Sequence, residues 1–148
     1  MSQLAPSGGY QDDVAVLLYR QPAPLEVEIP ADVGELAATR AALRGWLTRV
    51  GLEPEQTLDV LIAVGEAVSN SIEHGHREQL EGTVSLRATA FADRLHLTVV
   101  DTGRWKPSQA DPNSLRGRGI MLMRALMQDV TIEPSEAGTT VRMHTRIA

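Results

Sequence analysis

The sequence predicts a two-layer α+β sandwich, in which a mainly antiparallel sheet packs against about three helices on one face. Short runs that alternate apolar and polar residues are joined to their neighbours by tight turns, which is the pattern of hairpins. Other segments repeat apolar residues at helical spacing. The chain has 148 residues, of which 43% are hydrophobic, enough for one domain with a substantial core but short for two.

The first strand and the first helix are predicted between residues 25 and 51. The run 25–29 alternates apolar and acidic residues, the period of a half-buried strand, and Pro30 ends it. Asp32 can cap the helix that follows, with Glu35 in a capping-box position, and Gly51 is a suitable stop. One helical face carries Leu36, Leu43, Leu47 and Val50.

A second helix is predicted from Pro54 to about His74, because Pro is favoured early in a helix and Gly75 ends the pattern. Apolar residues surround most of this helix, so it should be buried. Glu66 and Asn70 are therefore unusual: they lie four residues apart, on one face of an otherwise apolar helix.

Two strands follow as a hairpin, with apolar residues alternating over 84–90 and 95–99 and a turn at 91–94. The second strand ends at Asp101-Thr102-Gly103, and a polar loop spans 104–114.

The glycine pair Gly117 and Gly119 is then predicted to lead into a helix from Ile120 to about Met127. Two last strands, at 130–132 and 141–147, should be joined through Pro134 and Gly138.

The bulk composition excludes several classes of protein. A formal charge of −5 argues against a direct nucleic-acid partner, and the absence of cysteine excludes disulfides and thiolate metal sites. The sequence has no run of 18 apolar residues that could span a membrane, and its first nine residues lack the features of a signal peptide. A cytoplasmic protein with no membrane partner is expected.

Four segments could carry chemistry: Glu66 with Asn70, Asp101-x-Gly103, Gly117-x-Gly119 and Gly138-Thr139-Thr140. Each alone has an ordinary structural explanation, such as a surface carboxylate, a turn former or a helix start, because short motifs match often by chance. Together they supply what binding and reaction of one ligand, Mg-ATP, require: a group that hydrogen-bonds adenine, a metal ligand, a phosphate-binding segment and a base. The glycines form neither a Walker A loop nor a Rossmann fingerprint.

Each of these residue types suits one of those needs. Asp101 at a strand end can accept a hydrogen bond from the adenine amino group, and Gly103 allows the backbone close to the base. The Asn70 amide oxygen is a hard ligand for Mg²⁺. Glycines at a helix start expose N–H groups to phosphates. Glu66, one turn before Asn70, could polarise a water or a hydroxyl.

Three segments resemble the boxes of the GHKL ATPases, in matching order and spacing over about residues 25–147. The run 66–75 resembles the N box, 101–105 the G1 box and 116–123 the G2 box. The short lid and the run 119–127 are most similar to the anti-sigma factor serine-protein kinases of the RsbW/SpoIIAB type. The resemblance implies the GHKL (Bergerat) ATP-binding fold.

The family also implies roles for the matching positions. Glu66 would be the general base and Asn70 would hold Mg²⁺, while Asp101 and Gly103 would read adenine. Trp105 stands where the G1 box often has a second glycine, which puts lid mobility and turnover in question. The remaining nucleotide-binding positions implied by the boxes are His74, Arg116, Gly117, Arg118, Gly119 and Ile120, with Thr139 or Thr140 near the adenine.

The resemblance further implies a kinase that moves the γ-phosphate of Mg-ATP to a STAS-type anti-anti-sigma factor and that also sequesters a sigma factor, as a homodimer. The alternative is a catalytically weak, ATP-dependent binding module of a partner-switching system. A third reading is an ATPase subunit that gates its own partner domain.

The sequence divides into an N-terminal extension, 1–23, and an ATP-binding domain, 24–148. The run 9–20 resembles the last strand of SpoIIE-like serine/threonine phosphatases, so the extension could be a phosphatase-domain remnant. An added edge strand explains so short a match equally well.

Overall fold

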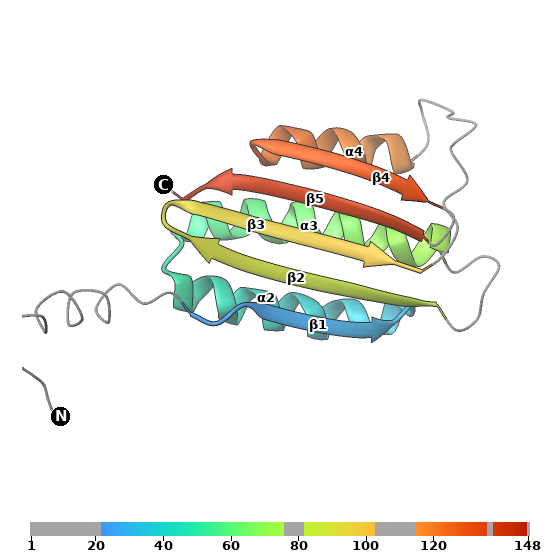
Figure 1. The fold of residues 1–148 in the computed structure, drawn as a ribbon, viewed down its shortest axis with the longest axis horizontal. Helices are drawn as coiled ribbons and strands as arrows, with labels where there is room; N and C mark the ends of the chain where they lie inside the picture. The colour runs from blue at the N-terminus through green and yellow to red at the C-terminus, as the bar shows by residue number, and fades with distance from the viewer. Residues whose placement is uncertain (1–21, 76–81, 103–114, 136–137, 148) are drawn as a thin grey trace, which may run out of the picture.

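The computed structural model describes residues 22–75, 82–102, 115–135 and 138–147, with residues 74, 75 and 115–117 described by their backbone only (Figure 1). The N-terminal extension up to residue 21, including the predicted strand-like run, lies outside the described residues, as does the loop at 104–114. Within the described part of the chain, no helix has the length and apolar character needed to cross a membrane.

The sheet has five strands in the order β1-β2-β3-β5-β4, and every neighbouring pair is antiparallel. The β2–β3 turn at Ala92 and Asp93 is the predicted hairpin, and Ala92 takes a positive φ of 55° there. The strands are β1 (Leu25–Pro30), β2 (Thr83–Phe91), β3 (Arg94–Asp101), β4 (Asp129–Ser135) and β5 (Gly138–Arg146).

The first helical segment follows the predicted signals. Asp32 Oδ1 accepts a hydrogen bond from Gly34 N at 3.0 Å, which caps the short 3₁₀ turn η1 (Val33–Glu35) ahead of α2 (Leu36–Val50). Gly51 then ends α2 with a φ of 95°, a left-handed conformation that favours glycine.

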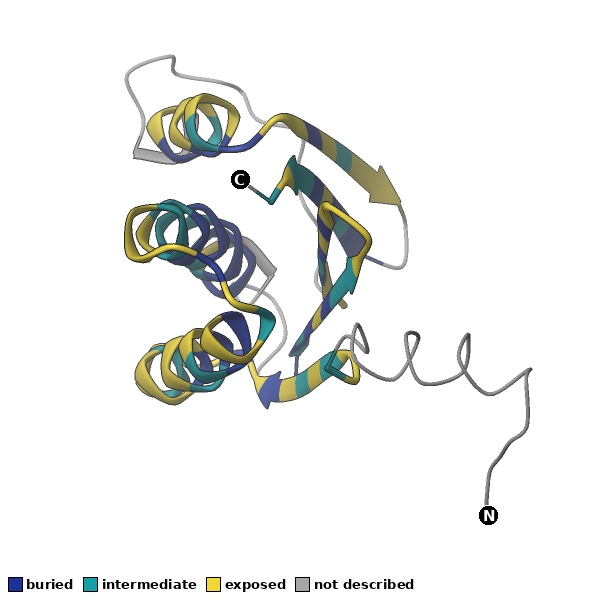
Figure 2. Ribbon diagram, turned by 90° about the vertical axis from the view of Figure 1, so that its left-hand side faces the viewer, coloured by how far each residue is buried: buried dark blue, intermediate teal, exposed yellow. Residues whose placement is uncertain are grey.

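Helix α3 (Pro54–Gly75) has the predicted bounds and the predicted buried position. It lies between α2 and α4 (Leu115–Leu126), and the three helices cover one face of the sheet (Figure 2). An antiparallel sheet can leave its other face to solvent, and the alternating burial along the strands follows from that arrangement. The predicted α+β sandwich is therefore confirmed.

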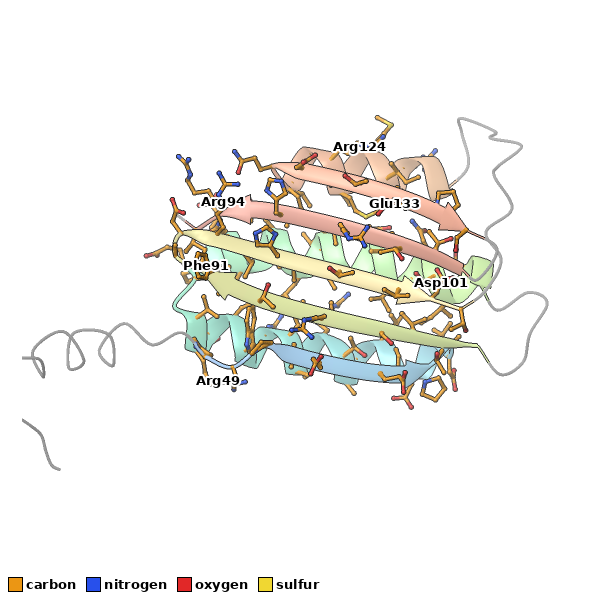
Figure 3. All side chains as sticks on the ribbon, in the orientation of Figure 1. Arg49, Phe91, Arg94, Asp101, Arg124 and Glu133 are labelled. Atoms are coloured by element: carbon orange, nitrogen blue, oxygen red, sulfur yellow. The ribbon has the colours of Figure 1, made fainter. Side chains whose placement is uncertain are left out.

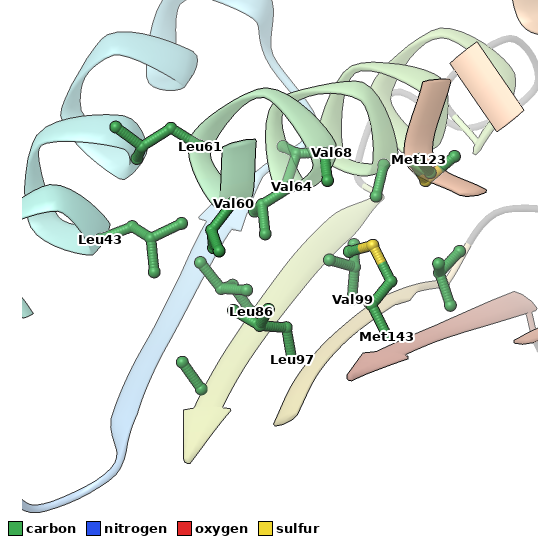
Figure 4. Close-up of a cluster of buried hydrophobic side chains, with 14 of the residues drawn as sticks. Leu43, Val60, Leu61, Val64, Val68, Leu86, Leu97, Val99, Met123 and Met143 are labelled. Atoms are coloured by element: carbon green, nitrogen blue, oxygen red, sulfur yellow. The ribbon is translucent and has the colours of Figure 1, made fainter. Parts of the chain in front are cut away.

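The core fills the space between the helices and the sheet (Figure 4). Branched aliphatic residues and methionines supply it, as a chain with only 3% aromatics requires. Trp46 is an exception: its ring is buried, and its Nε1–H donates to the Ala23 carbonyl at 2.8 Å, which ties the segment before β1 to α2.

The predicted start of the last helix was wrong. Helix α4 begins at Leu115, five residues before the predicted Ile120, so Gly117 and Gly119 lie inside the helix and do not precede it. Glycine costs about 1 kcal/mol relative to alanine inside a helix, a reasonable ground for ending the prediction there. Tertiary packing overrides this cost, because α4 lies against α3 at Gly119.

The predicted link between the last two strands was also wrong. Pro134 lies within β4 and Gly138 is the first residue of β5, so both residues pair across the sheet. Proline is tolerated there because β4 is an edge strand, whose outer side needs no ladder hydrogen bonds.

The methionines within α4 and the one directly after it divide between core and surface. Met123 and Met127 are 1% and 4% exposed and fill the core beside α3 and the sheet, whereas Met121 is 70% exposed. The helical spacing of the first two predicts their burial, and Met121 lies on the opposite side of the same helix.

Replacing Leu97 with Ala should lower the free energy of unfolding by about 2–5 kcal/mol, because the residue is fully buried on the central strand and its removal leaves a cavity. Val100→Ala, on the exposed side of the same strand, should change it by less than about 1 kcal/mol. Urea denaturation followed by circular dichroism measures both. Equal losses for the two variants would contradict this assignment of the core face.

Candidate functional site

The segments selected from the sequence gather at one end of the molecule. The carboxyl ends of α3 and β3 lie there, together with the first residues of β5 and of α4 (Figure 1). Asp101 marks this end in the side-chain view (Figure 3). An antiparallel sheet brings the end of β3 beside the start of β5, and α3 and α4 are packed side by side behind them.

Glu66 and Asn70 meet α4 at Gly119. A methyl group added at Gly119 would lie 2.8 Å from Glu66 Oε2 and 3.1 Å from Asn70 Nδ2, so only glycine leaves these side chains undisturbed. The four-residue spacing puts both side chains on the same face of α3. The N-box pair and the second glycine of the G2 box therefore form one cluster across two helices.

The Asn70 side chain is buried without a complete set of partners. The residue is 5% exposed, and its Nδ2 has no hydrogen-bond partner within the part of the chain that the structure describes. Leaving such a group unsatisfied costs about 1–3 kcal/mol, so native proteins rarely do so without a reason. A polar ligand that reaches the space beside Asn70 and Glu66 would remove this cost.

Asp101 and Thr139 form a second pair, across β3 and β5. They are directly opposite in the strand register, and the Thr139 backbone N–H donates to Asp101 Oδ1 at 3.3 Å. Both residues are almost fully buried, at 2% and 1% exposure. The Thr139 hydroxyl oxygen is also buried and has no hydrogen-bond partner among the described residues. Two polar side chains thus lie side by side among the buried residues of the described strands, which are otherwise apolar.

The other predicted positions differ in their surroundings. Arg118 is exposed on α4, and Ile120 is half-buried against the core. Thr140 is half-buried, and it pairs with Val100 on β3 rather than with Asp101. For His74, Arg116 and Gly117 only the backbone is described, and Gly103 lies outside the described residues. The structure thus brings together Glu66, Asn70 and Gly119, and, separately, Asp101 and Thr139.

The longer α4 changes which N–H groups are available to an anion. The first four N–H groups of an α-helix, counted from the N-cap residue, have no partner within the helix, and in the described part of α4 these belong to residues 115–117. Of the residues predicted to bind phosphate, Gly117 lies within this group, whereas Arg118 and Gly119 lie beyond it. In this conformation, the contribution of Gly119 is therefore space for Glu66 and Asn70.

Glu66 is also accessible from a second side. A hollow of about 290 Å³ lies between α2 and α3, and Glu66 lines it together with apolar residues and Arg40. A half-buried carboxylate that borders both this hollow and the Asn70 cluster can take a proton from a group on either side.

The residues fit Mg-ATP. The unpaired Nδ2 group of Asn70 could donate to a phosphate oxygen or to a metal-bound water, and the oxygen of the same amide, beside the Glu66 carboxylate, is a suitable ligand for a hydrated Mg²⁺ bound mainly by phosphate oxygens. A metal held mainly by protein would need more ligands, and among the described residues no group of three His, Cys, Asp or Glu could hold one.

The sequence places Gly138 in a candidate segment with Thr139 and Thr140, but it predicts no role for Gly138 itself beyond a possible turn. The structure places it against Asp101, with a positive φ of 145°. Its position directly before Thr139 was a usable signal, because Thr139 was already a candidate.

Comparisons with known proteins agree with the fold. The family model of the histidine kinase-like ATPase domain matches residues 29–145. The serine-protein kinase RsbW of Bacillus velezensis is 33% identical over 133 residues, which cover 80% of this chain and 82% of that protein. The RsbW of Bacillus subtilis is 32% identical, with the same coverage of both chains.

Solved structures give the same result. The RsbU and RsbW domains of a Mycobacterium tuberculosis protein match with a TM-score of 0.71 and 26% identity, over 85% of this chain. The match covers 33% of the chain in that structure. The histidine kinase domain of a blue-light activated kinase from Erythrobacter litoralis EL346 matches with a TM-score of 0.58 over 80% of this chain and 62% of that one, at 23% identity, which supports the fold alone. The chain thus belongs to the histidine kinase-like ATPase domain family and, within it, to the RsbW-type serine-protein kinases.

Proposed function

We propose that this protein is a Mg-ATP-dependent serine/threonine kinase that phosphorylates a STAS-type anti-anti-sigma factor. The observation that carries the proposal is the cluster of Glu66, Asn70 and Gly119, which combines a carboxylate and a buried amide at a helix start. A protein that only bound a partner would have no use for a carboxylate at that position. The named function of the RsbW relatives supports the same assignment.

The proposed roles follow from the chemistry of each group. Asp101 accepts a hydrogen bond from the adenine amino group, and the Thr139 hydroxyl gains its missing partner at the nucleotide. Asn70 holds Mg²⁺ through its amide oxygen. The first turn of α4 and the guanidinium groups of Arg116 and Arg118 bind phosphate oxygens. Gly103 gives the backbone access to the base.

Bound Mg-ATP would supply the phosphoryl group and the charge that neutralises it. Glu66 takes the proton from a serine or threonine hydroxyl of the acceptor, as that oxygen bonds to the γ-phosphorus and the bond to the departing ADP breaks. The acceptor would reach Glu66 through the hollow between α2 and α3, which that carboxylate lines. Glu66, Asn70 and the start of α4 contribute mainly by positioning the reacting groups.

A second function, capture of a sigma factor, is proposed together with the first because the family resemblance implies both. In a catalytically weak variant, the nucleotide would serve to set the shape of the binding surface, and capture would be the main function. Homodimer formation is likewise proposed from the resemblance. These partners and the need for ATP are consistent with a cytoplasmic protein.

The proposal is tested by incubating the protein with γ-labelled ATP, Mg²⁺ and a purified STAS-domain protein, and by following label on the acceptor. Transfer to a serine or threonine that disappears in EDTA is expected. Binding of ATP without any transfer, across a panel of STAS proteins, would leave only the binding module. A protein that did not bind ATP at millimolar concentration, on the order of its cellular level, would exclude both functions.

A further inference from the structure

Gly138 begins β5 in a backbone conformation that is restricted to glycine. Its φ is 145°, in the positive range that residues with a Cβ rarely adopt. A Cβ at this position would overlap the carbonyl oxygen of Asp101, and it would lie 2.8 Å from the Asp101 carbonyl carbon and 3.0 Å from Thr102 Cα. These atoms are backbone, so the conflict could be relieved only by moving the end of β3.

The end of β3 is held on its other side as well. The Thr102 hydroxyl accepts from the Thr83 backbone N–H at 3.1 Å, and the Thr102 N–H donates to the Thr83 carbonyl at 3.3 Å. Asp101 therefore lies between two strands. On one side, β2 holds the following residue, Thr102, and on the other side the Thr139 N–H of β5 donates to the Asp101 carboxylate. Displacing Asp101 away from β5 would break the contact with Thr139 and strain the contacts with β2.

Among the glycines, Gly51 offers a useful contrast. It also has a positive φ, of 95°, but a Cβ added there would meet no atom within 4 Å. It ends α2, at the opposite end of the molecule from Asp101 (Figure 1). The two positions share the conformational demand for glycine, and they differ in whether a side chain would collide with the site.

We infer that Gly138 is a positioning residue that sets base specificity: by letting β5 touch the backbone of Asp101, it fixes that carboxylate where it selects adenine over guanine. The inference rests on the proposed function, in which Asp101 accepts from the adenine amino group. A carboxylate held by a backbone N–H cannot turn away to suit another base, and guanine would present a carbonyl oxygen to it. A site discriminates strongly between two bases when one of its polar groups is fixed in place and the disfavoured base, here guanine, leaves that group unpaired.

The test measures binding of ATP and GTP in Mg²⁺ by isothermal titration for the parent, Gly138→Ala, Gly51→Ala and Asp101→Asn. The parent should prefer ATP, and Gly138→Ala and Asp101→Asn should each reduce that preference by on the order of tenfold or more. Gly51→Ala should lower the thermal midpoint, through the same positive φ, and keep the preference. Retained preference in a folded Gly138→Ala protein, with loss in Asp101→Asn, would overturn the inference and leave the proposed function standing.

A second measurement needs only the parent, in case Gly138→Ala does not fold. The amide resonances of Gly138 and Thr139 are followed by NMR during titration with Mg-ATP and, separately, with Mg-tripolyphosphate. Shifts with ATP but not with tripolyphosphate are expected, since only the former has a base to contact Asp101. No difference between the two titrations would overturn the inference, whereas no binding of ATP at all would overturn the proposed function itself.

Discussion

Replacing Glu66 with Gln is expected to slow phosphoryl transfer to the acceptor by about 10²–10⁴-fold, the usual contribution of a general base. The amide has nearly the shape of the carboxylate, so the side chain should keep its place beside Gly119 and ATP affinity should change little. Single-turnover transfer from labelled ATP measures the rate, and isothermal titration measures the affinity.

Glu73→Gln is the matched control, because Glu73 makes the same charge change from an exposed position on the same helix. It should transfer at the parent rate. A Glu66→Gln protein that transferred as fast as Glu73→Gln would remove Glu66 from catalysis. A Glu66→Gln protein that lost ATP affinity instead would indicate a binding role.

Replacing Asn70 with Ala should abolish the effect of Mg²⁺ on ATP binding. In the parent, we expect Mg²⁺ to raise the affinity for ATP by on the order of tenfold or more, a typical coupling between two ligands. The variant lacks the amide oxygen that would hold the metal, and so its affinity should be the same in Mg²⁺ and in EDTA. The rate of phosphoryl transfer should fall as well, because no metal ion is held where it would neutralise the charge on the phosphates.

Ser71→Ala tests whether damage to α3 alone has this effect. Ser71 is buried next to Asn70 in the sequence, and its hydroxyl donates to the Ala67 carbonyl one turn earlier, at 3.0 Å. This variant should keep the parent response to Mg²⁺. A persistent Mg²⁺ effect in Asn70→Ala, or its loss in Ser71→Ala, would show that Asn70 is not the metal ligand.

Local patterns predicted most of the fold because they have local causes. The capping aspartate at Asp32, the stop at Gly51 and the hairpin turn at 91–94 each depend on a few neighbouring residues. The two errors have a common cause. Gly119 within α4 and Gly138 at the start of β5 each lie where another element leaves little space for a side chain, which no local pattern shows.

The candidate site divides in the same way. The spacing of Glu66 and Asn70 predicts one helical face, and Asp101 is predicted at a strand end, since both follow from the period of a single element. The packing of α3 on α4 brings Gly119 beside Glu66 and Asn70, and the register of β3 with β5 lets Thr139 hold Asp101. Neither arrangement follows from the pattern of a single element.

The sequence by itself determined which residues could carry the chemistry, because residue type and local period are written in it. Only the tertiary structure decided the role of Gly138, which lies 37 residues beyond Asp101 in the chain yet touches its backbone. The physical reason is that excluded volume between two strands depends on their register, a long-range property that no local pattern contains.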